Sequence, residues 1–399
     1  MKMGWQTKTL GEICDIERGG SPRPIQKFIT IDPNGINWIK IGDATASGKY
    51  IYKTEEKIKP EGVKRSRMVY EGDFILSNSM SFGRPYIMKT TGCIHDGWLV
   101  LRQPKVDPDY LYHALSSDLV FDQFDRLAAG STVRNLNIGL AKSVEIPYPP
   151  LPEQRRIVGL LDEAFEGLAT AKANAEKNRK NARALFESHL QSVFTQRGPG
   201  WVEKRLADVA DFKNGLNFTR QSDGQTLRMV GVGDFQDHSI VPIETLQSVT
   251  IDGKLSDDYL IRRNDILTVR SNGSKDLVGR CMLVPDVDGM TSFSGFIIRI
   301  RFDTRVISSR FMLHFMKSSA TRDRLMRDGG GANISNINQA KLAELPVSLP
   351  SFSRQEEIAN RLDDLREETQ RLDRLYSRKL AALEALKKSL LHRAFSGQL

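Results

Sequence analysis

The chain repeats itself, and this repeat constrains the fold more than any other feature of the sequence. The first copy opens with the pattern W-x4-L-G-E-I-C-D-I-x2-G at residues 5–19, and residues 201–215 read W-x4-L-A-D-V-A-D-F-x2-G. Near the end of each copy, residues 130–137 correspond to residues 331–338, and Gln154 corresponds to Gln355. A repeat of this size encodes one structural unit twice, so we expect two related domains.

The segments between these shared landmarks hardly match. A shared framework with different loops is expected where two related domains make different contacts, because contacts lie mainly on loops. The alternative interpretation is a decayed duplication without any difference in function.

Each copy begins with short strands and continues into a helix. Segments rich in β-branched and aromatic residues and bounded by turn residues predict strands at 36–41, 73–77 and 97–102, with counterparts at 227–232, 265–269 and 296–300. A helix is predicted at 108–127 and again at 308–326, each leading to a glycine-rich loop. The pattern indicates an α/β domain of mixed element order in each copy.

A long helix is predicted after each domain, because residues 152–196 and 353–394 contain almost no Gly or Pro and are rich in Ala, Leu, Glu, Lys and Arg. Alternating steps of four and three from Ile157 and from Ile358 give two apolar seams in matching register, with polar breaks at Asn178 and Lys379. This 3.5-residue period is typical of a coiled coil. The seam positions are Ile157, Leu161, Leu168, Leu185, Ile358, Leu362, Leu365, Leu372, Leu383, Leu386 and Leu390.

Two equivalent helices that each carry an equivalent domain should pack antiparallel about a pseudo-two-fold axis. We therefore predict an α+β chain with two globular α/β domains, each followed by a long helix, the two helices forming an antiparallel coiled coil. The expected boundaries are 1–151 and 198–352 for the domains, and 152–197 and 353–399 for the helices.

The charge of the chain favours a surface that binds phosphates, and its few cysteines favour a reducing compartment. The net charge is +9, and the basic residues are spread through the chain, although an ordinary basic protein would look the same. The three cysteines have no close sequence partner, the N-terminus lacks an apolar signal region, and no apolar run is long enough to span a bilayer. We expect a cytoplasmic protein.

Three segments resemble catalytic motifs, but none matches the residues and spacing that its motif requires. Residues 42–50 have the wrong glycine spacing for a phosphate-binding loop, and we interpret them as a turn between strands. Asp43 with residues 55–57 loosely imitates a metal nuclease, and residues 147–150 imitate an amino-methyltransferase motif with its letters in the wrong order. His113 and His314 occupy equivalent places, where packing is the expected role. We expect no catalytic residue, metal site or cofactor on this chain.

Polar and basic loops that follow predicted strands or helices are the candidates for DNA contact. Such loops supply Lys and Arg for phosphates, and Arg, Asn, Gln or Ser for base edges. The candidates are Arg18, Ser21, Arg23, Ser77, Asn78, Arg84, Thr132, Arg134 and Asn135 in the first copy, and Lys213, Arg220, Arg270, Asn272, Ser274, Lys275, Arg280, Asn333, Ser335 and Asn336 in the second.

Several motifs together resemble the specificity subunit of type I restriction–modification enzymes over essentially the whole chain. These are G-D-F-I at residues 72–75, the G-S-T-x3-L-N loop running into I-P-x-P-P-L-x-E-Q-x2-I at residues 130–157, and L-L-x-R-A-F-S-G-x-L at residues 390–399. One departure is the second junction, residues 346–352, which lacks the double proline.

The resemblance implies a non-catalytic subunit with two target recognition domains, one for each half of a split double-stranded DNA site. It also implies helices that set the half-site spacing and dock two methyltransferase subunits, which carry S-adenosylmethionine, while two restriction subunits use ATP and Mg²⁺. The alternatives are a self-contained DNA methyltransferase or nuclease, and a coiled-coil adaptor without DNA readout.

Overall fold

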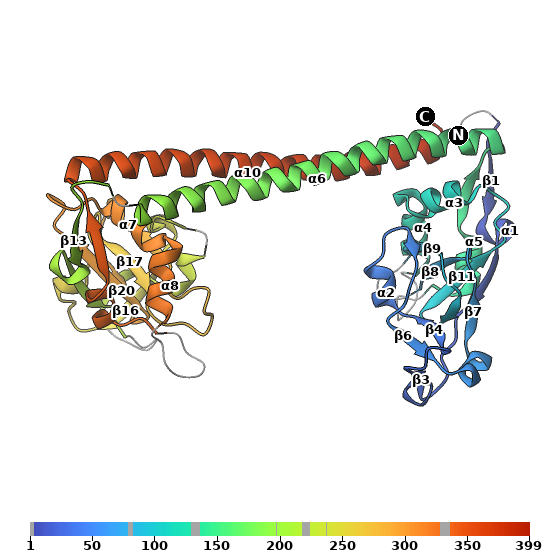
Figure 1. Cartoon of the computed structure of the whole chain (residues 1–399), viewed down its shortest axis with the longest axis horizontal. Helices are drawn as coiled ribbons and strands as arrows, with labels where there is room; N and C mark the ends of the chain where they lie inside the picture. Colours follow the sequence, from blue (N-terminus) through green and yellow to red (C-terminus); the bar gives the residue numbers. More distant parts are fainter. Residues whose placement is uncertain are drawn as a thin grey trace. The chain divides into compact units, whose positions relative to one another are not determined.

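The computed structural model describes residues 4–78, 83–128, 136–196, 198–217, 224–236, 238–327 and 336–399. It divides into two compact units. The first contains residues 1–176 and 378–399, and the second contains residues 177–377. Both long helices therefore contribute to both units. The cartoon in Figure 1 labels the elements of each.

The first unit contains two five-stranded sheets and a two-stranded ribbon. One sheet has the order β2-β11-β8-β9-β5, formed by Asp15–Arg18, Trp98–Arg102, Phe74–Ser77, Pro85–Met88 and Tyr50–Ile51. The other has the order β3-β6-β4-β10-β7, formed by Ile29–Thr30, Glu56–Ile58, Ile36–Ile39, Gly92–Ile94 and Arg67–Val69. In the ribbon, β1 (Gln6–Thr9) pairs antiparallel with β12 (Glu145–Tyr148). The helices are α1 (Leu10–Ile13), α2 (Ile41–Thr45), α3 (Pro108–Leu115), α4 (Asp118–Ala128) and α5 (Ile138–Ser143).

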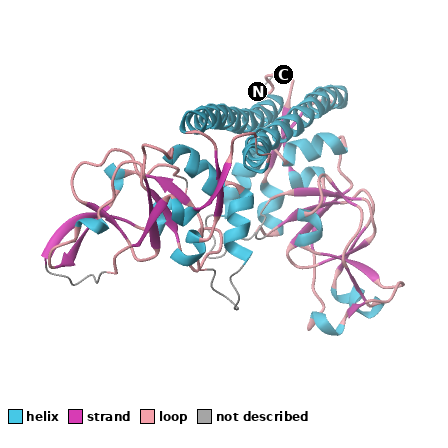
Figure 2. Ribbon diagram, turned by 60° about the vertical axis from the view of Figure 1, so that its left-hand side comes forward, coloured by secondary structure: helices cyan, strands magenta, loops and turns pink. Residues whose placement is uncertain are grey.

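The second unit repeats this plan, with fewer strands among the residues that the structure describes. Its main sheet has the order β14-β20-β17-β18, formed by Ala210–Asn214, Ile297–Phe302, Ile266–Val269 and Cys281–Leu283. A three-stranded sheet, β16-β15-β19, is formed by Gln247–Asp252, Gly224–Val230 and Thr291–Phe293, and β13 (Val202–Arg205) pairs with β21 (Pro346–Leu349). The helices are α7 (Ser309–Lys317), α8 (Ser319–Arg327) and α9 (Gln339–Ala343). Figure 2 shows the mixture of strands and helices.

The two long helices are α6 (Leu151–Thr195) and α10 (Phe352–Phe395). In the first unit, Arg156 donates to the main-chain oxygen of Leu399 at 3.0 Å, and Lys172 forms a 2.6 Å ion pair with Glu384. Residue numbers rise along α6 as they fall along α10, so the helices run antiparallel, as expected. In the second unit, Asp373 of α10 accepts from Arg179 and Arg183 of α6.

A buried glutamine attaches each domain to its helix. Gln154 Oε1 accepts from the main-chain N–H of Asp107 at 2.8 Å, while Gln154 Nε2 donates to Pro149 O at 2.8 Å. Gln355 makes the equivalent bonds to Ser308 N at 2.9 Å and to Pro350 O at 3.0 Å. The second junction therefore keeps this geometry without the double proline.

The predicted strands are present, but two of them end early. β4 stops at Ile39 and β15 stops at Val230, because an aspartate starts a helical turn directly afterwards. Asp43 Oδ2 accepts from Lys40 N, and Asp234 Oδ2 accepts from Gly231 N, both at 2.8 Å. Residues 42–50 lie between β4 and β5, in keeping with the interpretation as a turn between strands, but they begin within the short helix α2.

Each single helix predicted after the strands is in fact two. α3 and α4 are separated at residues 116–117, and α7 and α8 are separated at Ser318. Ser117 and Ser318 are fully buried, and their hydroxyls donate to the carbonyls of Ala114 and Phe315 at 2.6 and 2.8 Å. A serine side chain competes with the helix for main-chain groups and so favours a break at this position.

The expected seam holds along most of both helices and fails near their ends. Ile157, Leu161, Ile358 and Leu362 are buried; Leu168, Leu365, Leu372, Leu383 and Leu390 are half-buried. Leu185 and Leu386, however, are 54% and 48% exposed, so their assignment to the seam is wrong. Leu190 and Leu391 are buried instead and join the core clusters of the second and first units. The strict 3.5-residue period fails here because the helix end packs on a domain as well as on another helix.

Candidate nucleic-acid interface

The candidate loops leave one end of the main sheet in each unit. In the first unit, Arg18 of β2 lies opposite Leu99, and Ser77 of β8 lies opposite Trp98. In the second unit, Asn214 of β14 lies opposite Ile298, and Val269 of β17 lies opposite Ile297. The candidate loops therefore follow β2 and β8 in the first unit and the equivalent strands β14 and β17 in the second. In each unit they lie beside the start of the strand between them, β11 or β20.

A glycine at this end is required in both copies. A Cβ on Gly19 would lie 2.0 Å from the carbonyl oxygen of His95, and one on Gly215 would lie 2.1 Å from that of Ser294. The main-chain N–H groups of Gly19 and Gly215 donate to the carbonyls of Trp98 and Ile297 at 2.9 and 3.0 Å. This close approach explains why the opening motif of each copy ends in Gly, and it brings the next loop against the sheet.

Four predicted DNA-contact residues of the first unit meet around Asp96. The Asp96 carboxylate accepts from Ser21 Oγ at 2.6 Å and pairs with Arg23 at 3.2 Å. The Asp96 main-chain oxygen accepts from Arg18 Nε at 3.1 Å and from Asn78 Nδ2 at 2.9 Å. The Ser21 hydrogen bond and the Arg23 charge hold the pKa of Asp96 below its usual value, so the carboxylate stays ionised. Two separate loops are thus tied to one anchor.

The remaining described candidates of the first unit border this cluster. Ser77 is fully buried, and its main-chain N–H donates to the carbonyl of Arg84 at 3.4 Å. Arg84 is exposed, with its guanidinium 5.2 Å from the ring centre of Tyr86. A cation resting on an aromatic ring remains available to a phosphate or to a base edge.

Four candidates of the second unit lie on the loop after β17. Arg270, half-buried, follows the strand directly, and its main-chain oxygen accepts from Ile337 N at 2.8 Å. Asn272 Oδ1 accepts from Ser274 N at 2.8 Å, which closes a local turn. Ser274 and Lys275 are exposed at its tip.

Two further candidates of the second unit have partners within the protein. Lys213 lies within strand β14, where its ammonium is 4.5 Å from the ring centre of Tyr259 and 3.6 Å from Asp258. Arg280 donates to the main-chain oxygens of Asp276, Phe235 and Gln236. Its guanidinium therefore links the loop after β17 to residues 235–236.

Asn336 lies beside this loop, since it forms a β-bridge with Ser271. The other candidates lie outside the described residues: Thr132, Arg134, Asn135, Arg220, Asn333 and Ser335.

Buried polar atoms without a partner concentrate at these strand ends. Among the described residues, Asn78 Oδ1 and Arg270 Nε are buried and make no hydrogen bond. These two residues are equivalent, because the main-chain N–H of each donates to the residue before β11 or β20, at 3.0 and 2.8 Å. Asn214 Oδ1 and Ser294 Oγ are likewise buried and make no hydrogen bond among the described residues. An unsatisfied buried polar group costs about 1–3 kcal/mol, so a ligand that pairs with it gains affinity there.

The sequence reasoning missed the residues just before β11 and β20. His95 is half-buried between Trp38 and Trp98, its Nδ1 accepts from Gly97 N at 2.9 Å, and burial lowers its pKa. His95-Asp96-Gly97 is a polar turn directly before a predicted strand, and this signal would have found both Asp96 and His95. The second unit has Gly295 where the first has Asp96.

The residues that imitate a metal nuclease have structural partners. Asp43 accepts from the main-chain N–H groups of Lys40 and Glu55, Glu56 pairs with Lys40 at 2.7 Å, and Lys57 donates to Pro33 O. Within the part of the chain that the structure describes, no cluster of His, Cys, Asp and Glu could hold a metal ion. No helix of that part has the length and apolarity needed to cross a bilayer.

The two equivalent histidines are buried, as expected, and each also bonds to a long helix. His113 Nε2 lies 2.9 Å from Asp162 Oδ1, and His314 Nε2 lies 3.0 Å from Asp363 Oδ1. Burial lowers the pKa of both histidines, so the neutral ring can donate its Nε2–H to the carboxylate.

Comparison with known proteins decides the family. A model described as the type I restriction modification DNA specificity domain matches residues 2–178 and, a second time, residues 199–377. The chain belongs to this family. It is a type I restriction–modification specificity subunit with two target recognition domains, and each copy of the repeat corresponds to one of them.

Relatives align along most of the chain. The type I restriction enzyme StySPI specificity subunit of Salmonella potsdam is 24% identical over 417 residues, which cover 99% of this chain and 89% of that protein. The EcoKI specificity subunit of Escherichia coli K12 is 24% identical over 319 residues, covering 75% of this chain and 68% of that protein.

Two solved structures share the fold of the specificity subunit. One, concerned with complex assembly and conformational transition of the type I R-M system, has a TM-score of 0.79 at 20% identity and covers 100% of this chain and 99% of its own. The other, the HsdS subunit from Thermoanaerobacter tengcongensis, has a TM-score of 0.63 at 19% identity and covers 100% and 98%.

Proposed function

We propose that this specificity subunit reads a bipartite double-stranded DNA site, with one half-site for each unit. The observation that carries the proposal is the equivalent pair Asn78 and Arg270, each with a buried polar atom unpaired among the described residues. Asn pairs with adenine edges and Arg with guanine edges in the major groove. Because equivalent positions carry different residue types, the two half-sites should differ in sequence.

The surroundings of this pair support different readout by the two units. In the first unit, Asp96 neutralises part of the charge of Arg23 and fixes two loops. In the second unit, Gly295 stands in its place, and Arg270 and Lys275 have no carboxylate partner among the described residues. Phosphate contacts then position each unit, while the few residues at the strand ends specify bases.

We further propose that the chain acts without catalysis of its own. Two methyltransferase subunits that carry S-adenosylmethionine would modify adenine, and two restriction subunits would use ATP and Mg²⁺. The long helices would set the distance between half-sites, since α6 passes without a break from one unit into the other.

Methylome sequencing of the host, with and without this gene, tests the proposal. We expect one bipartite adenine-methylation motif to disappear when the gene is deleted. An unchanged methylome would contradict the proposal. Methylation or cleavage of DNA by the purified chain alone would instead favour a self-contained enzyme. Binding to a methyltransferase partner without salt-dependent DNA binding would favour an adaptor.

An Arg270→Ala variant tests the observation that carries the proposal. It should reduce discrimination at one base position of one half-site by about tenfold or more, and leave the other half-site unchanged. Arg263→Ala is the matched control, because Arg263 precedes β17 whereas Arg270 follows it, and Arg263 is exposed and paired with Asp286. Equal effects of the two variants would mean that the readout does not occur at this strand end.

A further inference from the structure

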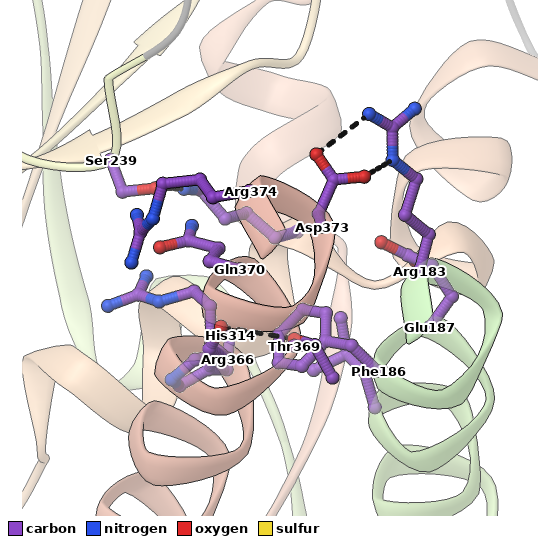
Figure 3. Close-up of a pocket in the computed structure, with 12 residues that line it drawn as sticks. Arg183, Phe186, Glu187, Ser239, His314, Arg366, Thr369, Gln370, Asp373 and Arg374 are labelled. Carbon is purple, nitrogen blue, oxygen red and sulfur yellow. Dashed lines mark hydrogen bonds and ion pairs between the residues drawn. The ribbon is translucent and has the colours of Figure 1, made fainter. Parts of the chain in front are cut away.

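A pocket of about 550 Å³ lies within the second unit, and none of the candidate DNA-contact residues is among those that line it. Three helices line it: the C-terminal part of α6, the helix α7, and the N-terminal half of α10. Its volume lies in the range of small-molecule sites, roughly 300–1,000 Å³. The close-up in Figure 3 shows its lining residues.

Cationic side chains converge on this pocket. Arg366, Gln370 and Arg374 follow one another at four-residue spacing on α10, so they project from one face of that helix. Lys317 of α7 adds a fourth polar group. In Figure 3, Arg183 and Asp373 pair on one side, while Gln370 and Arg374 lie toward Ser239 on the other.

Two of the four cations, Arg183 and Arg366, have carboxylate partners, whereas Lys317 and Arg374 have none among the described residues. One nitrogen of Arg366, Nη1, is buried without a hydrogen-bond partner among the described residues, although Nη2 pairs with Asp363 at 3.0 Å. The Lys317 ammonium donates to the neutral Ser239 hydroxyl at 2.6 Å, and burial lowers its pKa to about 8. Burying cations together is costly unless an anion joins them.

The α6 wall is mixed, because Arg183 and Glu187 line it together with two apolar residues. Phe186 and Leu190 of α6 face the same pocket, and the Phe186 ring lies 6.3 Å from the ring of His314. Burial keeps His314 neutral by lowering its pKa, so this wall suits an aromatic or apolar group. A site that is cationic on one side and aromatic on the other matches a phosphate attached to a planar ring system.

The three cations are not repeated at the equivalent positions of the first unit. Under the 201-residue repeat, the positions equivalent to Lys317, Arg366 and Arg374 are Ser116, Phe165 and Ala173. The first unit has the cation and the ring exchanged instead, because Lys387, the equivalent of Phe186, lies 5.1 Å from the ring centre of Phe165.

We propose that this pocket binds a mononucleotide, with its phosphates on Lys317, Arg366 and Arg374 and its base against Phe186. The site lies on the specificity subunit itself and is separate from the candidate DNA-reading loops. It does not depend on which DNA sequence the chain recognises.

Isothermal titration calorimetry of the full chain with ATP, AMP and inorganic phosphate, in buffer without Mg²⁺ at about pH 7, tests the proposal. We expect one nucleotide per chain, bound more tightly than inorganic phosphate. Arg374→Ala and Lys317→Met should each weaken nucleotide binding by about tenfold or more, since each removes a charge-assisted hydrogen bond. Arg374 is exposed, so its replacement should leave the melting temperature unchanged.

Arg378→Ala is the matched control, because it removes the same charge one turn further along α10 at an exposed position outside the pocket lining. It should bind nucleotide as the unmodified chain does. Several results would overturn the proposal: no heat from either nucleotide, equal affinity for AMP and inorganic phosphate, or equal loss in Arg374→Ala and Arg378→Ala. Weaker DNA binding by Arg374→Ala without any nucleotide binding would assign the cations to a DNA phosphate instead.

Discussion

At the scale of single residues, the two copies of the repeat share glycines and histidines at equivalent positions that the packing constrains. Gly19 and Gly215 permit main-chain approaches that a Cβ would block, and Gly83 and Gly279 both adopt positive φ at the turn before Arg84 and Arg280. Each of these positions is constrained by main chain rather than by side chains, which is why the repeat retains them while the neighbouring loops diverge.

Gly19→Ala and Gly215→Ala should each destabilise the chain by about 1–3 kcal/mol, because a main-chain carbonyl must move to admit the methyl group. Urea unfolding measures the effect. Gly42→Ala is the control: nothing lies within 4 Å of the added Cβ, and the residue is helical. Its stability should stay equal or rise by up to about 1 kcal/mol. Equal losses in all three variants would contradict the steric argument.

The buried histidines predict a pH dependence. Burial lowers the pKa of His113 and His314 below the unfolded value of 6.5, so the unfolded chain binds more protons in the window just below that pH. Their stabilising contribution is complete above about pH 6.5 and is lost as the pH falls through the folded pKa.

Thermal melting at about pH 7.5 and about pH 5.5 tests this prediction. The unmodified chain should lose melting temperature on acidification, and the double variant His113→Gln/His314→Gln should lose less, since glutamine does not titrate. The same acid-induced loss in both proteins would show that other groups are responsible.

At the scale of elements, the two long helices combine two packing regimes. Their middle parts follow a helix–helix seam, whereas their ends pack on domain cores. Leu190 lies in the core cluster of the second unit with Ile358 and Leu362, and Leu391 lies in that of the first unit with Ile157 and Leu161. The exposed Leu185 and Leu386 mark the equivalent places where one regime replaces the other.

Leu190→Ala should therefore cost about 2–5 kcal/mol of unfolding free energy, the usual range for a buried leucine. Leu185→Ala, on the same helix and chemically identical, should change it by less than about 0.5 kcal/mol. Urea denaturation monitored by circular dichroism distinguishes them. A larger loss of unfolding free energy in Leu185→Ala than in Leu190→Ala would instead place Leu185 in the seam, as the strict 3.5-residue period requires.

At the scale of the whole molecule, the proposed function makes the helices a spacer. α6 has 45 residues, about 67 Å at 1.5 Å per residue. One inserted heptad adds about 10 Å, close to the rise of three base pairs at about 3.4 Å each. A heptad also keeps the apolar seam in phase with the partner helix.

We expect a chain with one heptad inserted after Leu168 of α6, and a matching heptad after Lys387 of α10, to accept a spacer about three base pairs longer. Each half-site should remain unchanged. Methylation of DNA libraries by the assembled complex measures both properties. Altered half-sites, with the original spacer retained, would show that the helices do not set the distance.

The sequence alone predicted the duplicated plan, the strands of the main sheets and the antiparallel long helices. Each depends on local pattern: β-branched runs between turns, an absence of Gly and Pro, and a sustained apolar period. The family resemblance followed from motifs that the structure explains, such as Gln154 and Gln355, whose side chains join each domain to its helix.

The candidate site was predicted less completely, and the reasons are physical. Arg18, Ser21, Arg23 and Asn78 are visible as polar loop residues, but their convergence on Asp96 depends on strand pairing. The first three lie 73 to 78 positions from Asp96, and Asn78 lies 18 positions from it. The partners that occupy Lys213 and Arg280, and the breaks at Ser117 and Ser318, likewise depend on contacts distant in sequence.

The sequence by itself determined which elements form and that they form twice, because helix and strand patterns act over a few residues. Only the tertiary structure decided which polar atoms remain buried without a partner, where the seam of α6 and α10 gives way to domain cores, and that cations of α7 and α10 share one pocket. Those properties depend on packing between distant segments, which no local pattern encodes.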